Sequence, residues 1–119
     1  MKSFTDIPQS EKLAEILPIK SADMFYWRGV VLRRGNYKAM NTEFDIPCWS
    51  LAALLDLLPI CCDDGHHCLT LINANPYGEI EWICCYEDSN GDWLHEFYAS
   101  NPIDACYEMI FKLKENGLL

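Results

Sequence analysis

Two turn motifs constrain the fold of this chain more than any other feature of its sequence. Asn75–Gly78 and Asp88–Gly91 are both rich in turn-forming residues, and the second ends in Asn-Gly, the strongest short-range hairpin signal. The two motifs separate three stretches of β-forming residues, namely residues 69–73, 79–87 and 93–99. Because short turns join neighbouring antiparallel strands, we expect these stretches to form a three-stranded antiparallel meander.

The alternation of residues in the middle stretch assigns its two faces. Successive side chains on a strand point to opposite sides, so every second residue shares a face. The mainly apolar set is expected to face the core: Ile80, Trp82, Cys84 and Tyr86. The other set carries three glutamates and is expected to lie partly in water: Glu79, Glu81, Ile83, Cys85 and Glu87. We treat Glu79, Glu81 and Glu87 as candidate partner-binding residues.

Two helices carry clear start and stop signals. The first is predicted from Pro8 to Leu17, with Asp6 as its N-cap. The last is predicted to start after the N-cap Asn101, with Pro102 in its first turn, and to end before Gly117. The apolar residues of the last helix recur at helical spacing: Ile103, Cys106, Tyr107, Ile110 and Leu113. We expect this stripe to pack across the meander.

A third helix is predicted within the stretch from Pro47 to Pro59, which prolines bracket. Ser50 can cap its start, or Trp49 can already be helical. The stretch is apolar on nearly every side, with leucines in one stripe and further apolar surface beside it: Leu51, Leu54, Leu55 and Leu58, then Trp49 and Leu57. Such a helix is either central to a core or covered by a partner. Both interpretations are open, so Trp49 and Leu57 are candidate partner-binding residues.

The N-terminal part adds further strands. Residues 24–27 and 30–32 are predicted to be strands with Gly29 in a bulge or turn between them, and residues 37–40 are predicted to return as a short strand. The order α-β-β-α-β-β-β-α is typical of an α+β fold, with an antiparallel sheet and the helices on one face of it. Because 119 residues are too few for two good cores, we expect a single domain over residues 1–119.

The cysteines and the N-terminus indicate a reducing compartment. The chain has seven cysteines, an odd number, and two pairs of them are adjacent in sequence. The first residues contain no apolar segment of the kind that secretory signals have, and no apolar run approaches the ~20 residues of a membrane helix. We therefore expect a cytoplasmic protein with reduced thiols and no membrane association.

The charges are distributed unevenly along the chain. The net charge is −9; residues 1–38 hold seven bases and four acids, whereas residues 39–111 hold thirteen acids and no Lys or Arg. Such a field repels phosphates, so direct nucleic-acid binding is disfavoured, and it attracts a basic protein partner. The alternative is that the acidic surface only keeps a small protein soluble.

One short cluster of basic and aromatic residues contrasts with the acidic character of the rest of the chain. It combines four bases with four aromatic residues: Arg28, Arg33, Arg34 and Lys38 with Phe25, Tyr26, Trp27 and Tyr37. Such a combination can bind single-stranded nucleic acid by stacking and charge. Four positive charges beside a strongly acidic remainder favour intramolecular pairing or solvation instead.

The densest cluster of chemically active side chains is the stretch from Cys61 to Cys68, referred to below as the Cys/His loop. It contains five candidate metal ligands: Cys61, Cys62, His66, His67 and Cys68. Zinc needs about four such ligands, but the paired spacings of zinc knuckles are absent, and a plain polar loop is the alternative. Cys68 beside a histidine, or Cys84 or Cys85 beside His95, could also form a nucleophile pair, although no local motif supports one. No catalytic motif of a common enzyme class is present.

Three segments of the chain together resemble a known family. They are Lys12–Pro18 with Ser21–Met24, then Pro47–Pro59, then Asn101–Met109. The chain resembles a family of small uncharacterised proteins found in gut Bacteroides-type bacteria, their phages and mobile elements. The resemblance covers most of the chain and implies a cytoplasmic, phage-derived accessory protein. That family has no assigned activity, so no functional residue is carried over from it, and the Cys/His loop is less typical of its pattern.

These observations favour a non-enzymatic module that binds another, basic protein. The acidic field, the apolar excess of the predicted middle helix and the lack of a catalytic motif support this prediction. The alternative is a zinc-binding protein or small enzyme that uses the Cys/His loop. Homodimerisation through the middle helix or an open sheet edge is compatible with both hypotheses.

Overall fold

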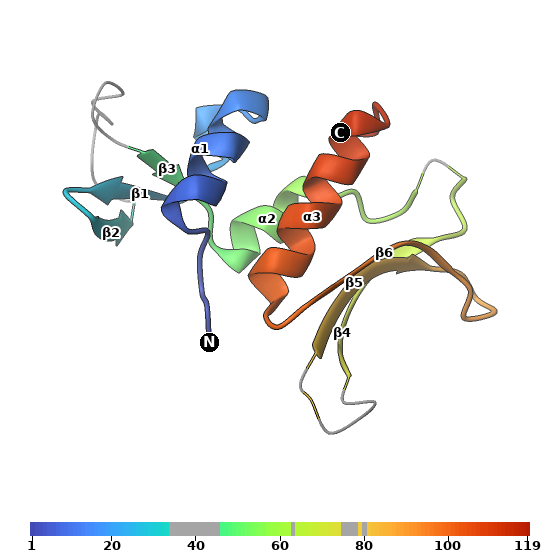
Figure 1. Ribbon diagram of the computed structural model, residues 1–119. Coiled ribbons are helices and arrows are strands. Elements are labelled where there is room, and N and C mark those ends of the chain that lie inside the picture. Colours follow the sequence, from blue (N-terminus) through green and yellow to red (C-terminus); the bar gives the residue numbers. More distant parts are fainter. Residues whose placement is uncertain (34–45, 63, 75–78, 80) are drawn as a thin grey trace.

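In the part of the chain that the structure describes, three helices lie between two small antiparallel sheets (Figure 1). The computed structural model describes residues 1–33, 46–62, 64–74, 79 and 81–119. The predicted α+β class is confirmed, with one correction. The N-terminal strands do not extend the meander but form a sheet of their own. The predicted strand at residues 37–40 lies outside the described residues.

The first sheet has the strand order β2-β1-β3. Strands β1 (Met24–Trp27) and β2 (Val30–Arg33) form the predicted hairpin. Arg28 and Gly29 join them and both have positive φ, at 50° and 78°, as a type I′ turn requires. Strand β3 (Ile46–Cys48) is not indicated by the sequence, because Pro47 and Cys48 directly precede a helical stretch and proline is rare in strands. It lies at an edge of the sheet, where a proline is tolerated because one side of the strand needs no donor.

The second sheet is the predicted meander, in the order β4-β5-β6. Strand β4 (Cys68–Ala74) pairs with β5 (Glu81–Glu87) without interruption. The pairing of β5 with β6 (Trp93–Ala99) shifts between Cys84 and Tyr86, opposite His95, which has a positive φ of 52°. This irregularity has the signature of a β-bulge. The Asn75–Gly78 turn motif lies outside the described residues.

The helix boundaries follow the predicted caps. Helix α1 (Ile7–Ile16) starts with a capping box, in which Asp6 accepts from the Gln9 amide and the Gln9 side chain accepts from the Asp6 amide. A short 3₁₀ turn, η1 (Ile19–Ser21), follows it. Helix α2 (Leu51–Leu57) begins at the Ser50 cap, so Trp49 precedes the helix. None of the helices in the described part of the chain is long and apolar enough to cross a bilayer.

Helix α3 (Pro102–Glu115) starts at the Asn101 cap, as predicted, and its backbone turns out of the helix at Gly117, whose φ is 72°. It packs on β5 and β6 and against α2 (Figure 1), so it lies at the centre of the molecule. The core gathers around it and draws on all three helices and on β5. Its fully buried members include Leu13, Trp49, Leu54, Cys84, Tyr86, Ile103, Cys106, Met109 and Ile110. The predicted core role of Cys84 and Tyr86 on β5 is therefore confirmed.

Candidate functional site

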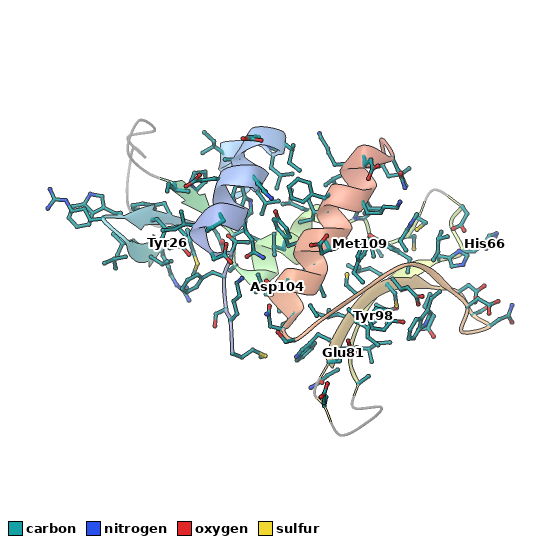
Figure 2. All side chains as sticks on the ribbon, viewed as in Figure 1. Tyr26, His66, Glu81, Tyr98, Asp104 and Met109 are labelled. Carbon is teal, nitrogen blue, oxygen red and sulfur yellow. The ribbon has the colours of Figure 1, made fainter. Side chains whose placement is uncertain are left out.

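The face of the second sheet that points away from α3 is referred to below as the outer face. Cys84 and Tyr86 point to α3 and the core, so their neighbours on β5, Ile83, Cys85 and Glu87, point the other way. Paired residues on adjacent strands share a face. The outer face therefore consists of Cys68, Thr70, Ile72 and Ala74 on β4, Glu81, Ile83, Cys85 and Glu87 on β5, and Trp93, Glu96 and Tyr98 on β6. In Figure 2, Glu81 and Tyr98 lie on this side of the sheet.

Aromatic and acidic side chains form the solvent-exposed part of the outer face. The side chains of Trp93 and Tyr98 are 38% and 49% exposed, whereas Ile83 and Cys85 beneath them are 5% and 0% exposed. The Tyr98 hydroxyl donates to Glu96 at 3.1 Å. Partial burial and this hydrogen bond both raise the pKa of Tyr98. Among the elements that the structure describes, none packs over this face (Figure 1).

The three predicted glutamates are distributed around this surface. Glu81 and Glu87 occupy opposite ends of β5 on the outer face and are half-buried, and Glu79 is exposed just before the strand. Glu96, which the sequence reasoning had not singled out, adds a fourth carboxylate from β6. Period-two alternation was the available signal for Glu96 and Tyr98, although strict alternation places Trp93, five positions before Tyr98, on the opposite face. The bulge at His95 weakens that signal, because it shifts the register halfway along the strand.

The Cys/His loop is organised by Asp64. Its carboxylate accepts from the backbone amides of His66 and His67 at 2.8 and 3.1 Å, and lies 2.5 Å from His67 Nδ1. These hydrogen bonds, the backbone ones first, lower the pKa of Asp64 to about 2. His67 Nε2 lies 3.7 Å from a carboxylate oxygen of Asp88, at the start of the β5–β6 turn. The loop is thereby connected to that hairpin.

The five predicted metal ligands do not converge. Cys61 and Cys68 lie together, but Cys62 is buried, with 8% of its surface exposed. His66 is exposed (Figure 2), and His67 is engaged by carboxylates. Nowhere in residues 1–33, 46–62, 64–74, 79 and 81–119 do three or more His, Cys, Asp or Glu side chains form a group that could hold a metal ion. Of the five candidates, the described residues bring only Cys61 and Cys68 together, and zinc binding at this loop stays a prediction.

The cysteines of β5 are poorly placed to act as nucleophiles. Cys84 and Cys85 are both 0% exposed. A hydrogen bond with Cys106, followed by burial, raises the pKa of Cys84. Burial raises the pKa of Cys85 to about 11, with nearby glutamates adding to the effect. Both groups are therefore protonated thiols at neutral pH, whereas nucleophilic attack requires a thiolate.

The two apolar candidates of the middle helix belong mainly to the core. Trp49 is 0% exposed, and its indole Nε1 donates to Ser21 Oγ at 3.0 Å. Trp49 therefore has no surface for a partner, which corrects its assignment as a partner-binding residue. Leu57 is partly buried and packs against the core cluster. The apolar excess of this helix is explained by its position between α3 and the N-terminal part of the chain.

The predicted basic and aromatic cluster is also only partly on the surface. Phe25 and Tyr26 are 2% and 8% exposed, so neither offers a ring for base stacking. Trp27 is exposed, and the Arg28 guanidinium lies over its ring at 4.8 Å from the centroid. Arg33 is exposed at the end of β2, and the other members of the cluster, Arg34, Tyr37 and Lys38, lie outside the described residues.

Thr5 is a structural centre that the sequence did not indicate. Its carbonyl accepts from the Tyr26 hydroxyl at 2.6 Å, and its hydroxyl accepts from the Trp49 amide at 3.1 Å. The Thr5 hydroxyl also lies 2.8 Å from Ser10 Oγ. Three segments far apart in sequence therefore meet at one fully buried threonine. No local sequence pattern around Thr5 predicts these contacts.

Comparison with known proteins adds no relative: no protein family, no curated protein and no solved structure matches the chain.

Proposed function

We propose that this chain is a small, non-enzymatic cytoplasmic module that binds a basic segment of another protein through the outer face of its second sheet. The main support for this proposal is that two exposed aromatic side chains, Trp93 and Tyr98, lie among carboxylates on a sheet face that no described element covers. Because the chain resembles small proteins of phages and mobile elements, we propose an accessory role for it in the cell that carries the gene.

The aromatic residues supply the apolar part of such an interface. Tyr and Trp are enriched among the residues that dominate binding energy, because they bury a large area while losing little side-chain entropy. The strands hold Trp93 and Tyr98 in place before a partner arrives. A preorganised surface of this kind lowers the cost of ordering on binding.

The charges favour a partner rich in Lys or Arg. Residues 39–111 contain no Lys or Arg, so the carboxylates of the second sheet have no base within their own part of the chain. Glu81, Glu87 and Glu96 therefore leave a negative potential over the outer face, which accelerates encounter with a basic segment. The same potential disfavours phosphorylated partners and nucleic acids.

A pair of charge-matched variants tests this proposal. The face variant replaces Glu81, Glu87 and Glu96 with Gln, and the control variant replaces three exposed glutamates elsewhere with Gln: Glu11, Glu15 and Glu115. Each variant removes three negative charges. Partners captured from lysate of the source cells are identified by mass spectrometry, and the purified partner is titrated against each variant by calorimetry.

The expected result is a Lys- or Arg-rich partner whose affinity falls at least tenfold for the face variant, stays near wild type for the control, and decreases with salt. Equal affinity for both triple variants, or an affinity independent of salt, would contradict the proposal. Native mass spectrometry of the protein alone distinguishes a further outcome. A homodimer that the face variant dissociates would make the partner a second copy of this chain.

A further inference from the structure

Two thiols of the Cys/His loop lie in contact. Cys61 Sγ and Cys68 Sγ are 2.9 Å apart, closer than any other pair of sulfur atoms for which the described residues show a contact. The two residues stand opposite each other in an antiparallel bridge. Cys61 follows the end of the α2 segment, and Cys68 begins β4. Their contact therefore closes the base of the loop.

The backbone around this pair has the geometry that a disulfide needs. Leu69 N donates to Ile60 O and Cys62 N donates to His67 O, both at 2.8 Å, so the hydrogen bonds flank the cysteines on either side. This pattern makes Cys61 and Cys68 a non-hydrogen-bonded pair. Such pairs have Cα atoms about 4.5 Å apart, within the ~4.4–6.8 Å that disulfides span. Small side-chain rotations can therefore bring the sulfurs to bonding distance without moving the backbone.

Exposure separates this pair from the other thiol contact in the protein. Cys68 is exposed and Cys61 is partly exposed, whereas Cys84 and Cys106 are both 0% exposed with their sulfurs 4.0 Å apart. A dissolved oxidant can reach the first pair but not the second. Cys84 and Cys106 thus provide an internal control, because their sulfurs are close together but a dissolved oxidant cannot reach them.

We infer that Cys61 and Cys68 form a reversible disulfide, a redox site driven by thiol–disulfide exchange with a low-molecular-weight disulfide such as oxidised glutathione. The more exposed Cys68 thiolate attacks one sulfur of that disulfide, which releases one glutathione thiolate and leaves a mixed disulfide. The Cys61 thiolate then attacks the Cys68 sulfur and releases the second glutathione. Two protein thiols are oxidised and one small disulfide is reduced to two thiols, so the two protons that the cysteines lose are taken up by the two glutathione thiolates.

The bond would also fix one wall of an apolar pocket. Cys61 lines a pocket of about 210 Å³ between the loop and the end of α3, together with Pro59, Cys62, Tyr86, Leu113 and Leu118. A bond between Cys61 and β4 holds this wall against the second sheet. Oxidation therefore ties the segment after α2 to the sheet that carries the outer face.

Peptide mapping after equilibration with reduced and oxidised glutathione tests the inference. Free thiols are alkylated, and the protein is cut before aspartates, because trypsin has no site in residues 39–111. Fragments 56–62 and 64–87 are expected to stay joined in the oxidised protein and to separate after reduction. Five of the seven cysteines should be alkylated in the oxidised state, compared with seven in the reduced state.

Single variants identify the two sulfurs. Cys61→Ser and Cys68→Ser should each abolish the joined fragments, whereas the neighbouring Cys62→Ala should retain them, and circular dichroism checks that each variant is folded. Full alkylation under oxidising conditions, a stable glutathione adduct on Cys68, or a link that survives in Cys68→Ser would each overturn the inference. Since the test needs no partner, its result is independent of the protein-binding function proposed above.

Discussion

The ammonium group of Lys2 lies 2.9 Å from a carboxylate oxygen of Asp104, although 102 positions separate the two residues in the chain. Asp104 also accepts from Gln9 Nε2 and Asn101 Nδ2, each at 2.8 Å. The first turn of α3 is thereby tied to the N-terminal segment and to α1 (Figure 2). This cluster connects the first helix to the helix that organises the core.

Replacing Asp104 with Asn should destabilise the protein by about 1–2 kcal/mol at neutral pH, since it removes charged hydrogen bonds that solvent partly screens. Burial alone would raise the pKa of Asp104, but hydrogen bonds from Lys2, Gln9 and Asn101 outweigh it and lower the pKa. The stabilisation is therefore complete above the ordinary value of 3.8 and is lost as the pH falls through the lower folded-state value. Urea unfolding at neutral and acidic pH should show the difference between wild type and variant shrinking in acid. The exposed Asp56→Asn is the control and should change little; a difference that persists in acid would contradict the assignment.

Replacing Trp49 with Ala should lower the free energy of unfolding by about 3–5 kcal/mol, because the substitution leaves a cavity at a fully buried site in the core. Trp49→Phe should cost less, since it keeps most of the apolar volume and loses the indole hydrogen bond to Ser21. Urea unfolding monitored by circular dichroism measures both losses. The half-exposed Trp27→Ala serves as the control. If Trp49→Ala were no more destabilising than Trp27→Ala, the core position of Trp49 would be wrong.

Tyr26 should titrate late and make the protein sensitive to alkali. Burial, followed by the nearby Cys48 thiol, raises the pKa of Tyr26 from 10.0 to about 12. Because the folded state raises this pKa, it favours the protonated Tyr26 hydroxyl. The stabilisation of the fold that results is complete below pH 10.0 and is lost as the pH rises toward about 12. Absorbance titration of tyrosinate in wild type and Tyr26→Phe should differ by one late-titrating group, and the unfolded protein in urea should lose the late phase. A difference spectrum already complete near the ordinary tyrosine pKa would contradict this expectation.

Oxidation of the Cys61–Cys68 pair should stabilise the fold by about 2 kcal/mol, since a disulfide around a short loop restricts the unfolded chain. The melting temperature should rise by several degrees for a domain of this size. Calorimetry of the reduced and oxidised protein measures the shift. Cys68→Ser treated with the same oxidant is the control and should melt at its untreated temperature. A lower melting temperature on oxidation would mean that the bond strains the native loop.

The features that could be predicted from the sequence are those set by neighbouring residues. Asp6 and Asn101 cap α1 and α3 because each side chain accepts from an amide three positions on. The Asp88 carboxylate likewise accepts from the amides of Asn90 and Asp92 at 2.9 Å and stabilises the hairpin turn that Asn-Gly predicted. These interactions are local, so they depend little on the rest of the fold.

The candidate sites depended more on tertiary structure. Alternation along β5 identified Glu81 and Glu87 on the outer face, but Trp93, Glu96 and Tyr98 were not identified, because the bulge opposite Cys85 interrupts their alternation. The composition of the Cys/His loop indicated metal binding, whereas the strand register brings only Cys61 and Cys68 together. Ligand types can be read from a sequence, but their distances depend on backbone pairing.

The sequence by itself determined the helices α1 and α3, the Asp88–Gly91 hairpin turn and the acidic character of the second sheet, because each follows from residue types within a few positions. The tertiary structure alone decided that the N-terminal strands form a separate sheet, that Trp49 is core, and that Thr5 joins three distant segments. These outcomes depend on which surfaces pack together. The packing energy is the total of many weak contacts between residues far apart in the chain, so it cannot be predicted from any short stretch of sequence.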